Sequence, residues 1–449
     1  MGGNTGCLTE TGTGFTFKLA MEEASRCLLC HDAPCSQACP AGTDPAKFIR
    51  SLRFKNVKGA IETIREANIL GGSCARVCPH EYLCEEACSR TELDKPIEIG
   101  KIQKFLTDYE DQIGMRVLES PEATLEKVAI IGAGPAGLAA AANLALKGYQ
   151  VTIYESREKA GGWLSYGIPP FRLPQKIVDT DVKYVKELGV EFRFGIKVGQ
   201  DITIEELQDQ GISAFIIATG MQRGRKLNYP GSDLEGILTG VDFLEKARKS
   251  EGDYQVPDNI AVIGGGDVAI DCATTSKKLG AKHVSLIYHR SFPEMSANET
   301  GVAYAQSLGV NILPNLNTDE FIGENGKVKA LKASGIEWDE NRNSNIIEDT
   351  QIKLKTDWII GAIGQLAADQ SFAGVELDDW GLIVVDEDTG QTNREGFFAA
   401  GDITNGGKTV VDAIATGKSV AETVDNYLNV VRELDEAVLQ VVSAKEGDE

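Results

Sequence analysis

The sequence predicts an α + α/β protein in which a cysteine-rich helical segment precedes two units built on parallel sheets. Two glycine-rich loops, GAGPAG at 132–137 and GGGDVA at 264–269, each stand between a short apolar run and a helical pattern. Eight of the ten cysteines lie between Cys27 and Cys88, ahead of both loops. At 449 residues the chain can form two or three domains, each with its own core.

Composition and charge exclude several classes of function. The net charge is −22 and the pI is about 4.7, so nucleic acid and anionic lipid would repel the chain. No apolar stretch is long enough to cross a membrane, and the first 15 residues lack the basic and apolar regions of a secretory signal. We therefore expect a cytoplasmic protein with no nucleic-acid or membrane partner.

The clustered cysteines fall into two groups with short spacings. The first group, C-x2-C-x4-C-x3-C-P, comprises Cys27, Cys30, Cys35 and Cys39. The second group, C-x3-C-P-x4-C-x3-C, comprises Cys74, Cys78, Cys84 and Cys88. Clustering in a long chain without a secretory signal favours metal ligation over disulfides, and the first spacing resembles that of ferredoxins. We expect two [4Fe–4S] clusters, with structural zinc or inert cysteines as the alternatives.

Spacing alone leaves the assignment of ligands to clusters open. Cys7 and Cys272 stand apart from both groups and are expected to be ordinary residues. Between the groups, Asp44 is a candidate N-cap with Pro45 at the first helical position. A further helix is expected over 97–109, where it carries Gln103. These patterns predict a helical domain around the cysteines.

The first glycine loop belongs to a complete βαβ pattern. An apolar strand over 128–131 precedes it, an Ala-rich helix follows over 138–146, and Glu155 ends the next strand. The three glycines permit a tight turn, close approach to a pyrophosphate and close helix packing, while the helix N-terminus attracts phosphate. The alternative is a glycine turn in some other α/β unit. The candidate dinucleotide-binding residues are Gly132, Gly134, Pro135, Ala136, Gly137, Glu155 and Gly162.

A second βαβ pattern surrounds the second loop, with strands expected over 260–263 and 284–288. Two such units in one chain predict a resident flavin and a visiting nicotinamide dinucleotide. The second strand ends in Tyr-His-Arg-Ser without an acid, so Arg290 favours NADPH over NADH. The alternative is an exposed arginine that touches nothing. The candidate residues are Gly264, Gly266, Asp267, Val268, His289 and Arg290.

The chain then returns to the first α/β unit through apolar runs at 358–363 and 397–402. A helix is expected from about Val410, so the flavin's ribityl–phosphate arm can be held by Gly401, Asp402, Thr409 and Val410. Neither α/β unit has a cysteine pair, which argues against a flavin disulfide reductase. Electrons would instead leave through the cysteine-rich head. Because the cofactors carry the chemistry, we name no catalytic acid, base or nucleophile.

These motifs together resemble a known family. CLLCHDAPCSQACP, CARVCP, GAGPAGL, YGIPPFRLP and GGGDVAID, in this order, are similar to the glutamate synthase small subunit family. Within it they resemble the FAD/iron–sulfur subunits of bacterial NAD(P)-dependent dihydropyrimidine dehydrogenases, over about residues 20–430. The resemblance implies a helical two-[4Fe–4S] domain followed by a glutathione-reductase-like pair of dinucleotide-binding domains. We accordingly expect an extension at 1–20, an iron–sulfur domain at 21–120, an FAD-binding domain at 121–222 and 365–430, an inserted NAD(P)H-binding domain at 223–364, and an acidic tail at 431–449.

The resemblance also implies ligands and partners. One cluster would be held by Cys27, Cys30, Cys35 and Cys88. The other would be held by Cys39, Cys78, Cys84 and the amide oxygen of Gln103, which leaves Cys74 unliganded. The chain would oxidise NAD(P)H at FAD and pass electrons, in a hetero-oligomer, to an FMN-containing barrel subunit that reduces uracil or thymine to the 5,6-dihydropyrimidine. The alternatives are a glutamate synthase small subunit, which delivers NADPH electrons to a glutamine-dependent large subunit, and a non-enzymatic scaffold.

Overall fold

The computed structural model describes residues 8–12, 14–339 and 344–446, with side chains as far as residue 434. Cys7, expected to be an ordinary residue, lies outside the described residues. Residue contacts divide the chain into two compact units. The larger unit contains Gly12–Ser165, Gln175–Met221 and Ala367–Glu449. The smaller unit contains Met1–Thr11, Tyr166–Pro174 and Gln222–Leu366.

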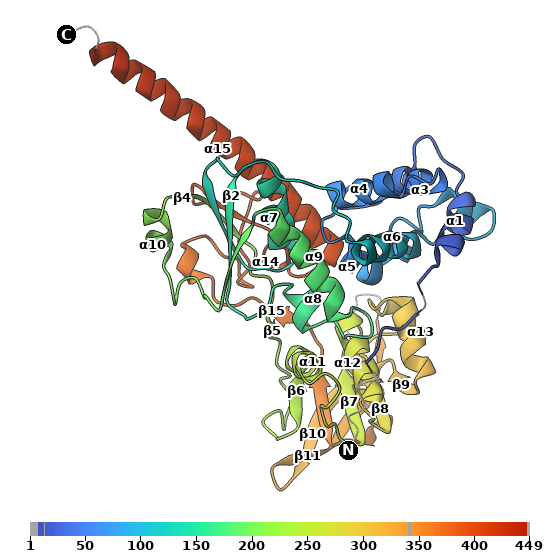
Figure 1. The fold of residues 1–449 in the computed structure, drawn as a ribbon. Coiled ribbons are helices and arrows are strands. Elements are labelled where there is room, and N and C mark those ends of the chain that lie inside the picture. Colours follow the sequence, from blue (N-terminus) through green and yellow to red (C-terminus); the bar gives the residue numbers. More distant parts are fainter. Residues whose placement is uncertain (1–7, 13, 340–343, 447–449) are drawn as a thin grey trace. The chain divides into compact units, whose positions relative to one another are not determined.

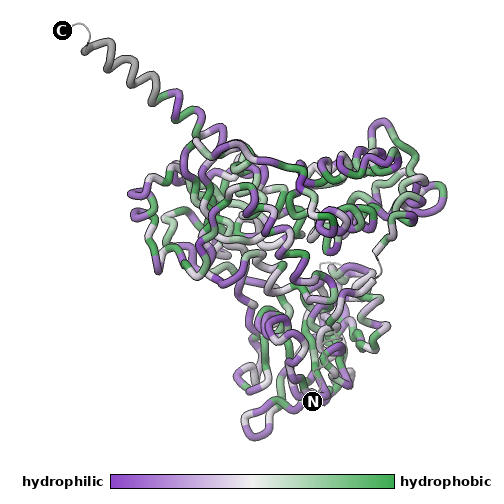
Figure 2. Tube along the Cα trace, in the orientation of Figure 1, coloured by the Kyte–Doolittle hydropathy of each residue, from purple (hydrophilic) through white to green (hydrophobic). Residues whose placement is uncertain are grey.

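The larger unit begins with a helical part that carries both cysteine groups (Figure 1). Its elements are α1 (Phe17–Ser25), α2 (Pro34–Gln37), α3 (Pro45–Arg53), α4 (Val57–Ala67), α5 (Gly71–Val77), α6 (Ile99–Ile113) and 3-10 turns at His80–Tyr82 and Ser89–Glu92. Asp44 is the N-cap of α3, as predicted: its side chain accepts a hydrogen bond from the Lys47 N–H at 2.9 Å. Apolar faces of these helices alternate with polar ones (Figure 2) and meet in one core.

The rest of the larger unit is a parallel sheet with its helices. The strands are β1 (Lys127–Ile131), β2 (Gln150–Glu155), β3 (Glu191–Phe194), β4 (Ile212–Ile217) and β16 (Phe397–Ala399), in the order β16-β4-β1-β2-β3. The helices are α7 (Pro135–Leu146), α8 (Trp163–Tyr166), α9 (Gln175–Glu187), α10 (Ile204–Asp209), α14 (Asp402–Asn405) and α15 (Val410–Glu446), and a 3-10 turn lies at Ser371–Ala373. α15 packs on α7 so closely that a Cβ atom on Gly417 would stand 2.2 Å from the Ala136 carbonyl oxygen.

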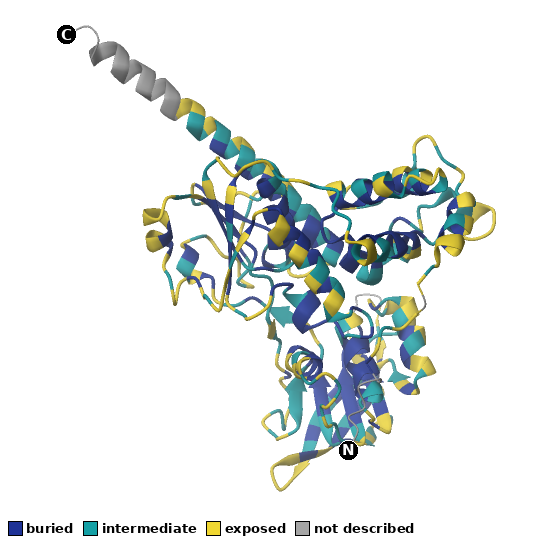
Figure 3. Cartoon of the chain, in the orientation of Figure 1, coloured by how far each residue is buried: buried dark blue, intermediate teal, exposed yellow. Residues whose placement is uncertain are grey.

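The smaller unit contains a second five-stranded parallel sheet, whose inner strands are buried (Figure 3). Its strands are β6 (Ile237–Thr239), β14 (Trp358–Gly361), β7 (Asn259–Ile263), β8 (His283–Ile287) and β9 (Val310–Leu313), in that order. Its helices are α11 (Gly240–Lys249), α12 (Asp267–Lys278) and α13 (Glu299–Ser307), with a 3-10 turn at Phe292–Glu294. An antiparallel sheet, which the sequence patterns did not predict, adds β10 (Leu316–Glu324), β11 (Lys327–Trp338), β12 (Ser344–Ile346) and β13 (Ile352–Lys355). A short ribbon pairs β5 (Arg223–Gly224) with β15 (Gln365–Leu366).

The loop YGIPPFRLP belongs with the smaller unit rather than with the sheet whose strands flank it in sequence. Arg172 in this loop forms an ion pair with Asp271 on α12, Nη1 to Oδ2 at 2.7 Å. The Phe171 carbonyl accepts hydrogen bonds from the N–H and the hydroxyl of Thr11, at 2.8 and 3.0 Å. Three separate stretches of chain therefore build the smaller unit. Within the described residues, every helix is too short or too polar to cross a bilayer.

Candidate cofactor sites

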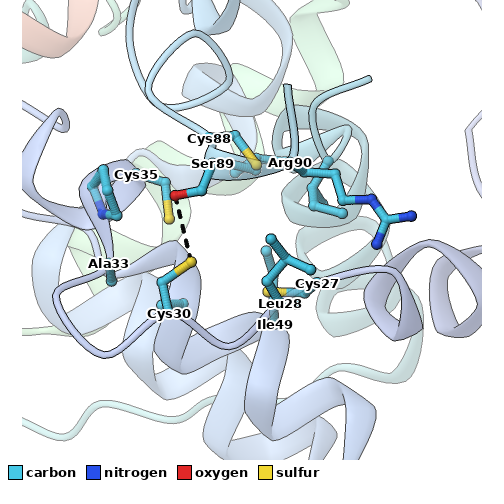
Figure 4. Close-up of a pocket in the computed structure, with 13 residues that line it drawn as sticks. Cys27, Leu28, Cys30, Ala33, Cys35, Ile49, Cys88, Ser89 and Arg90 are labelled. Atoms are coloured by element: carbon cyan, nitrogen blue, oxygen red, sulfur yellow. Dashed lines mark hydrogen bonds between the residues drawn. The ribbon is translucent and has the colours of Figure 1, made fainter. Parts of the chain in front are cut away.

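Four cysteines line one pocket in the helical part of the larger unit (Figure 4). They are Cys27, Cys30, Cys35 and Cys88. The first three come from the loop after α1 and from α2, and the last stands just before the 3-10 turn at Ser89–Glu92. The pocket contains about 370 Å³ free of protein atoms, its opening to solvent included. The chain folds so that the last cysteine of the second group joins the first group.

Apolar walls surround these thiols. The other pocket-lining residues include Leu28, Ala33, Pro34, Ala46, Ile49, Ile97 and Ile99. Burial, and then repulsion from Cys88, raises the pKa of Cys35 to about 11, and burial likewise raises the pKa of Cys27. The Cys30 thiol donates to the Ser89 hydroxyl at 3.5 Å. The thiols of Cys27 and Cys35 would therefore lose their protons together with the binding of a cation, as metal-ligating cysteines do.

The remaining cysteines gather around α5. Burial, followed by repulsion from Cys74, Cys84 and Cys39, raises the pKa of Cys78 far above its ordinary value. Burial, with Cys39 among the further causes, likewise raises the pKa of Cys84. Cys74 is buried in the same group, so the structure does not separate it from the other three thiols. Among the described residues, no three His, Cys, Asp or Glu side chains converge closely enough to hold a single metal ion.

Gln103 reaches this second group from α6. Its side chain is 6% exposed, and its Nε2 donates to the Gly71 carbonyl at the start of α5, at 2.8 Å. The part of the chain that the structure describes donates no hydrogen bond to its Oε1. An amide oxygen has two lone pairs, and those of this atom accept from no described residue, so it is available as a ligand. The second group thus fits a multi-ligand metal cluster, with Gln103 or Cys74 as the fourth ligand.

The first glycine loop leaves open space where backbone can approach a phosphate. Gly132 has φ +109°, and a Cβ atom there would stand 2.4 Å from the Ala218 carbonyl oxygen. A Cβ atom on Gly134 would meet nothing within 4 Å, whereas one on Gly162 would meet the Gly134 Cα at 3.0 Å. Gly162, a predicted dinucleotide-binding residue, therefore lies against the first glycine loop.

Glu155 ends β2, and its side chain is only 5% exposed. Its Oε2 accepts from the Ala133 N–H at 2.8 Å, and its Oε1 accepts from the Arg157 N–H at 2.9 Å. The Ser156 hydroxyl also donates to Oε1, at 3.3 Å, whereas Oε2 keeps a second lone pair. Glu155 can therefore brace the glycine loop and still accept from a ribose hydroxyl, a combination that the sequence pattern alone did not indicate.

Residues from the far end of the chain complete this site. Gly401 has φ +81°, and a Cβ atom there would stand 2.9 Å from the Ala136 Cβ on α7. Burial raises the pKa of Asp402, although its Oδ1 accepts from the Lys408 N–H at 3.3 Å. Thr409 is the cap of α15, since its hydroxyl accepts from the Asp412 N–H at 3.3 Å and its own N–H donates to Asp412 Oδ2 at 3.1 Å. The structure thus brings the predicted residues of the first loop and of the Gly401–Val410 segment together.

The second glycine loop lies at the start of α12 in the smaller unit. A Cβ atom on Gly264 would stand 2.3 Å from the Ala362 carbonyl oxygen, and Asp267 Oδ1 accepts from the Asn298 N–H at 2.9 Å. The Tyr288 ring covers this loop, because a Cβ atom on Gly265 would meet it at 2.3 Å. Sequence reasoning passed over Tyr288, although its place at the strand end beside His289 was a usable signal.

Arg290 contacts a neighbouring side chain, so the alternative of an arginine without contacts is wrong. Its guanidinium lies over the Trp338 ring, 5.5 Å from the ring centroid, and Trp338 Nε1 donates to the His289 carbonyl at 2.8 Å. Trp338 ends β11, in the sheet that the sequence patterns did not predict, so no motif pointed to it. The strand end therefore presents a cation on an aromatic platform, next to an exposed histidine.

Two protein families match the chain in separate regions. Residues 126–417 match the pyridine nucleotide-disulphide oxidoreductase family. Residues 5–115 match a family described as dihydropyrimidine dehydrogenase domain II, 4Fe-4S cluster. The second match covers both cysteine groups, and the first covers both glycine loops.

Whole-chain relatives agree with these matches. The chain is 44% identical, over 94% of its length and 97% of the relative, to the NAD-dependent dihydropyrimidine dehydrogenase subunit PreT of Escherichia coli K12. It is 32% identical, over 94% of its length and 92% of the relative, to the glutamate synthase [NADPH] small chain of Azospirillum brasilense. A solved structure of Mycobacterium tuberculosis FprA in complex with NADPH has a TM-score of 0.58 at 18% identity, over 69% of this chain and 86% of that one. That likeness concerns the fold.

Proposed function

The chain belongs to the pyridine nucleotide oxidoreductase family that includes dihydropyrimidine dehydrogenase subunits and glutamate synthase small chains, and on this premise we propose that it is the electron-input subunit of a pyrimidine-reducing complex. It is an NAD(P)H-dependent flavin and iron–sulfur oxidoreductase. The cofactors expected from the sequence, FAD, NAD(P)H and 4Fe-4S, are confirmed by the family matches.

One observation carries the choice of reaction. Identity to the dihydropyrimidine dehydrogenase subunit is 44% over nearly all of both chains, against 32% to the glutamate synthase small chain. The names of both relatives describe parts of larger complexes. We infer a partner that contains FMN and reduces the 5,6-double bond of uracil or thymine, because no such barrel occurs among the described elements of this chain.

The residues fit FAD and two iron–sulfur clusters at three sites in the larger unit. FAD would lie on the first glycine loop, Glu155, Gly162 and the Gly401–Val410 segment. One cluster would occupy the pocket of Cys27, Cys30, Cys35 and Cys88, and the other would be held by Cys39, Cys78, Cys84 and Gln103. When bound, FAD accepts a hydride from NAD(P)H and each cluster carries one electron at a time.

The chain's own residues position the cofactors relative to one another. The N-terminus of α15 stands beside Gly401. Asp412, in the first turn of α15, is close enough to Cys78 for its negative charge to raise the pKa of that thiol. The same larger unit therefore contains the flavin-binding candidates and both cysteine groups. We propose that residues 21–120 hold the clusters and that residues 121–222 and 365–430 bind FAD. Residues 223–364 would bind NAD(P)H, together with the YGIPPFRLP loop.

The test is an oxygen-free affinity purification of the chain from its own cell, with mass spectrometry of the proteins that accompany it. We expect an FMN-containing partner, and we expect the complex to reduce uracil or thymine with NADH or NADPH. Assays with each nucleotide in turn decide which one Arg290 favours. A large amidotransferase-type partner, together with glutamine-dependent glutamate formation, would contradict the pyrimidine reaction and establish the glutamate synthase alternative.

A further inference from the structure

One lysine of α15 reaches into the segment that carries the cysteines. Lys418 lies eight residues after Val410, or about two helical turns into α15. Its Nζ donates to the carbonyl oxygens of Ala41 and Ala67, each at 2.7 Å. Ala41 stands two residues after Cys39, and Ala67 is the last residue of α4. A helix that starts beside the proposed flavin site therefore holds the turn that follows a proposed cluster ligand.

The ammonium group has no carboxylate partner among the described residues within ion-pair distance. Glu422, one turn further along α15, pairs instead with Lys147 at 2.9 Å. Burial lowers the pKa of Lys418, and the negative charges of Cys39 and then of Glu422 oppose this effect. A half-buried cation that contacts only neutral carbonyls is costly, so its place here calls for a negative charge nearby. Glu422 supplies a part of that charge, although its carboxylate pairs with Lys147, and thiolates around a cluster at Cys39, Cys78 and Cys84 would supply the rest.

We propose that Lys418 is a positioning residue that raises the reduction potential of the cluster held by Cys39, Cys78 and Cys84. This inference rests on the proposed function. Reduction adds a negative charge to a thiolate-ligated cluster, and a nearby cation stabilises the reduced form. Attraction of this kind is stronger in a partly buried site than in water, and salt screens it less. Lys418 would thus favour the passage of electrons from the flavin-binding part of the larger unit into the cysteine-bearing part.

The experiment compares Lys418→Met, Lys418→Arg and wild type, each purified without oxygen. Iron, sulfide and FAD are quantified, and cluster midpoint potentials are measured by a redox titration followed by electron paramagnetic resonance. In Lys418→Met we expect one cluster to have a lower potential, with the ratio of reduced to oxidised cluster at least tenfold lower at the wild-type midpoint, or about 59 mV for one electron. In Lys418→Arg the positive charge remains, so the potential should stay near that of wild type.

Lys147→Met is the matched control. Lys147, the C-cap of α7, also pairs with α15, with Glu422 at 2.9 Å and Asp425 at 2.6 Å. Its loss removes the same charge from the same helix interface but leaves the Lys418 contacts with Ala41 and Ala67 in place. We expect both midpoint potentials to be unchanged in this variant.

Three outcomes would overturn the inference. They are unshifted potentials in an iron-loaded Lys418→Met variant, an equal shift in Lys418→Arg, and an equal shift in Lys147→Met. If Lys418→Met fails to retain iron, Lys418→Gln keeps hydrogen-bond donors without the charge, and a wild-type potential in that variant would contradict the inference. Absence of clusters from the wild-type protein would contradict the proposed function as well, whereas loaded wild type with an unshifted variant contradicts only the role of Lys418.

Discussion

At the residue scale, a buried ion-pair network fixes the helical part of the larger unit to its sheet. Arg65 on α4 donates from Nε to Glu110 Oε2 at 2.8 Å and from Nη1 to Asp181 Oδ1 at 2.7 Å. All three side chains are 1% exposed. Asp181 also accepts from the N–H and the hydroxyl of Ser73 on α5, at 2.8 Å each. The network therefore connects α4, α5 and α6 to α9, which stands between β2 and β3 along the chain.

Arg65→Met should destabilise the protein by about 3–5 kcal/mol, because it leaves two buried carboxylates without their partner. The matched control is Lys58→Met on the same helix, where Lys58 and Glu62 form an exposed pair at 3.5 Å. Removing an exposed pair of this kind costs about 0.5 kcal/mol or less. The measurement is the free energy of unfolding in urea. Similar losses in the two variants would show that the buried network contributes no more than a surface pair.

Glu110 gives this network a pH dependence. Burial raises its pKa above the ordinary value of 4.5, although Arg65 opposes the shift. A carboxyl with a raised pKa in the folded state contributes stability that is present below pH 4.5 and is lost as the pH rises through the folded-state pKa. The difference in unfolding free energy between Glu110→Gln and wild type should therefore move in favour of the variant as the pH rises from 4.5 toward 7. A difference that is constant with pH would contradict this.

Gly417 is required by contact rather than by backbone conformation. Its helix approaches α7 until a Cβ atom would stand 2.2 Å from the Ala136 carbonyl oxygen. Gly417→Ala should lower stability by about 1–3 kcal/mol and weaken FAD retention, because Ala136 lies in the first glycine loop. Gly301→Ala on α13 is the control, since its Cβ atom would meet Ile270 at an ordinary 3.5 Å. There the helical alanine should stabilise by about 0.5–1 kcal/mol.

At the scale of elements, short apolar runs before glycine loops were sufficient to locate β1, β7 and the helices after them. Asp44 with Pro45 likewise marked the start of α3. These signals are local, because strand burial, turn geometry and capping depend on adjacent residues. The sheet of β10–β13 was not predicted, although Asn325-Gly326 between β10 and β11, with φ +52° and +76°, is the sequence signal of a two-residue hairpin turn. Trp338, which supports Arg290, lies in that sheet and could not be found by motif.

The cysteine pocket also depends on long-range folding, since Cys88 meets Cys27 and Cys35 only when the helices pack. Cys35→Ser should reduce iron and sulfide by about half, if the chain carries two clusters, and should leave FAD content unchanged. Cys272→Ala is the control, because Cys272 is buried in the smaller unit, where it is close to Gly240. Elemental analysis with flavin absorbance measures both. Loss of all iron from Cys35→Ser would show that the two sites do not fill independently.

At the scale of the whole molecule, each unit is assembled from stretches that are distant in sequence. In the smaller unit, Arg172 from the YGIPPFRLP loop satisfies Asp271, whose pKa burial raises. Arg172→Met should destabilise this unit by about 1–3 kcal/mol, since Arg172 is partly exposed. The double variant with Asp271→Asn should recover part of the loss, because a buried amide costs less than a buried charge. Additive losses in thermal unfolding would contradict this coupling.

The discontinuous larger unit has a consequence for the order of events during synthesis. Both cysteine groups leave the ribosome early, whereas β16 and α15 leave it last. Until β16 arrives, one edge of β4 has no neighbour, and until α15 arrives, Lys418 is not there to hold the carbonyls of Ala41 and Ala67. The nascent chain thus presents its thiols to the cell's iron-delivery machinery before the helix that later contacts their loops has been made.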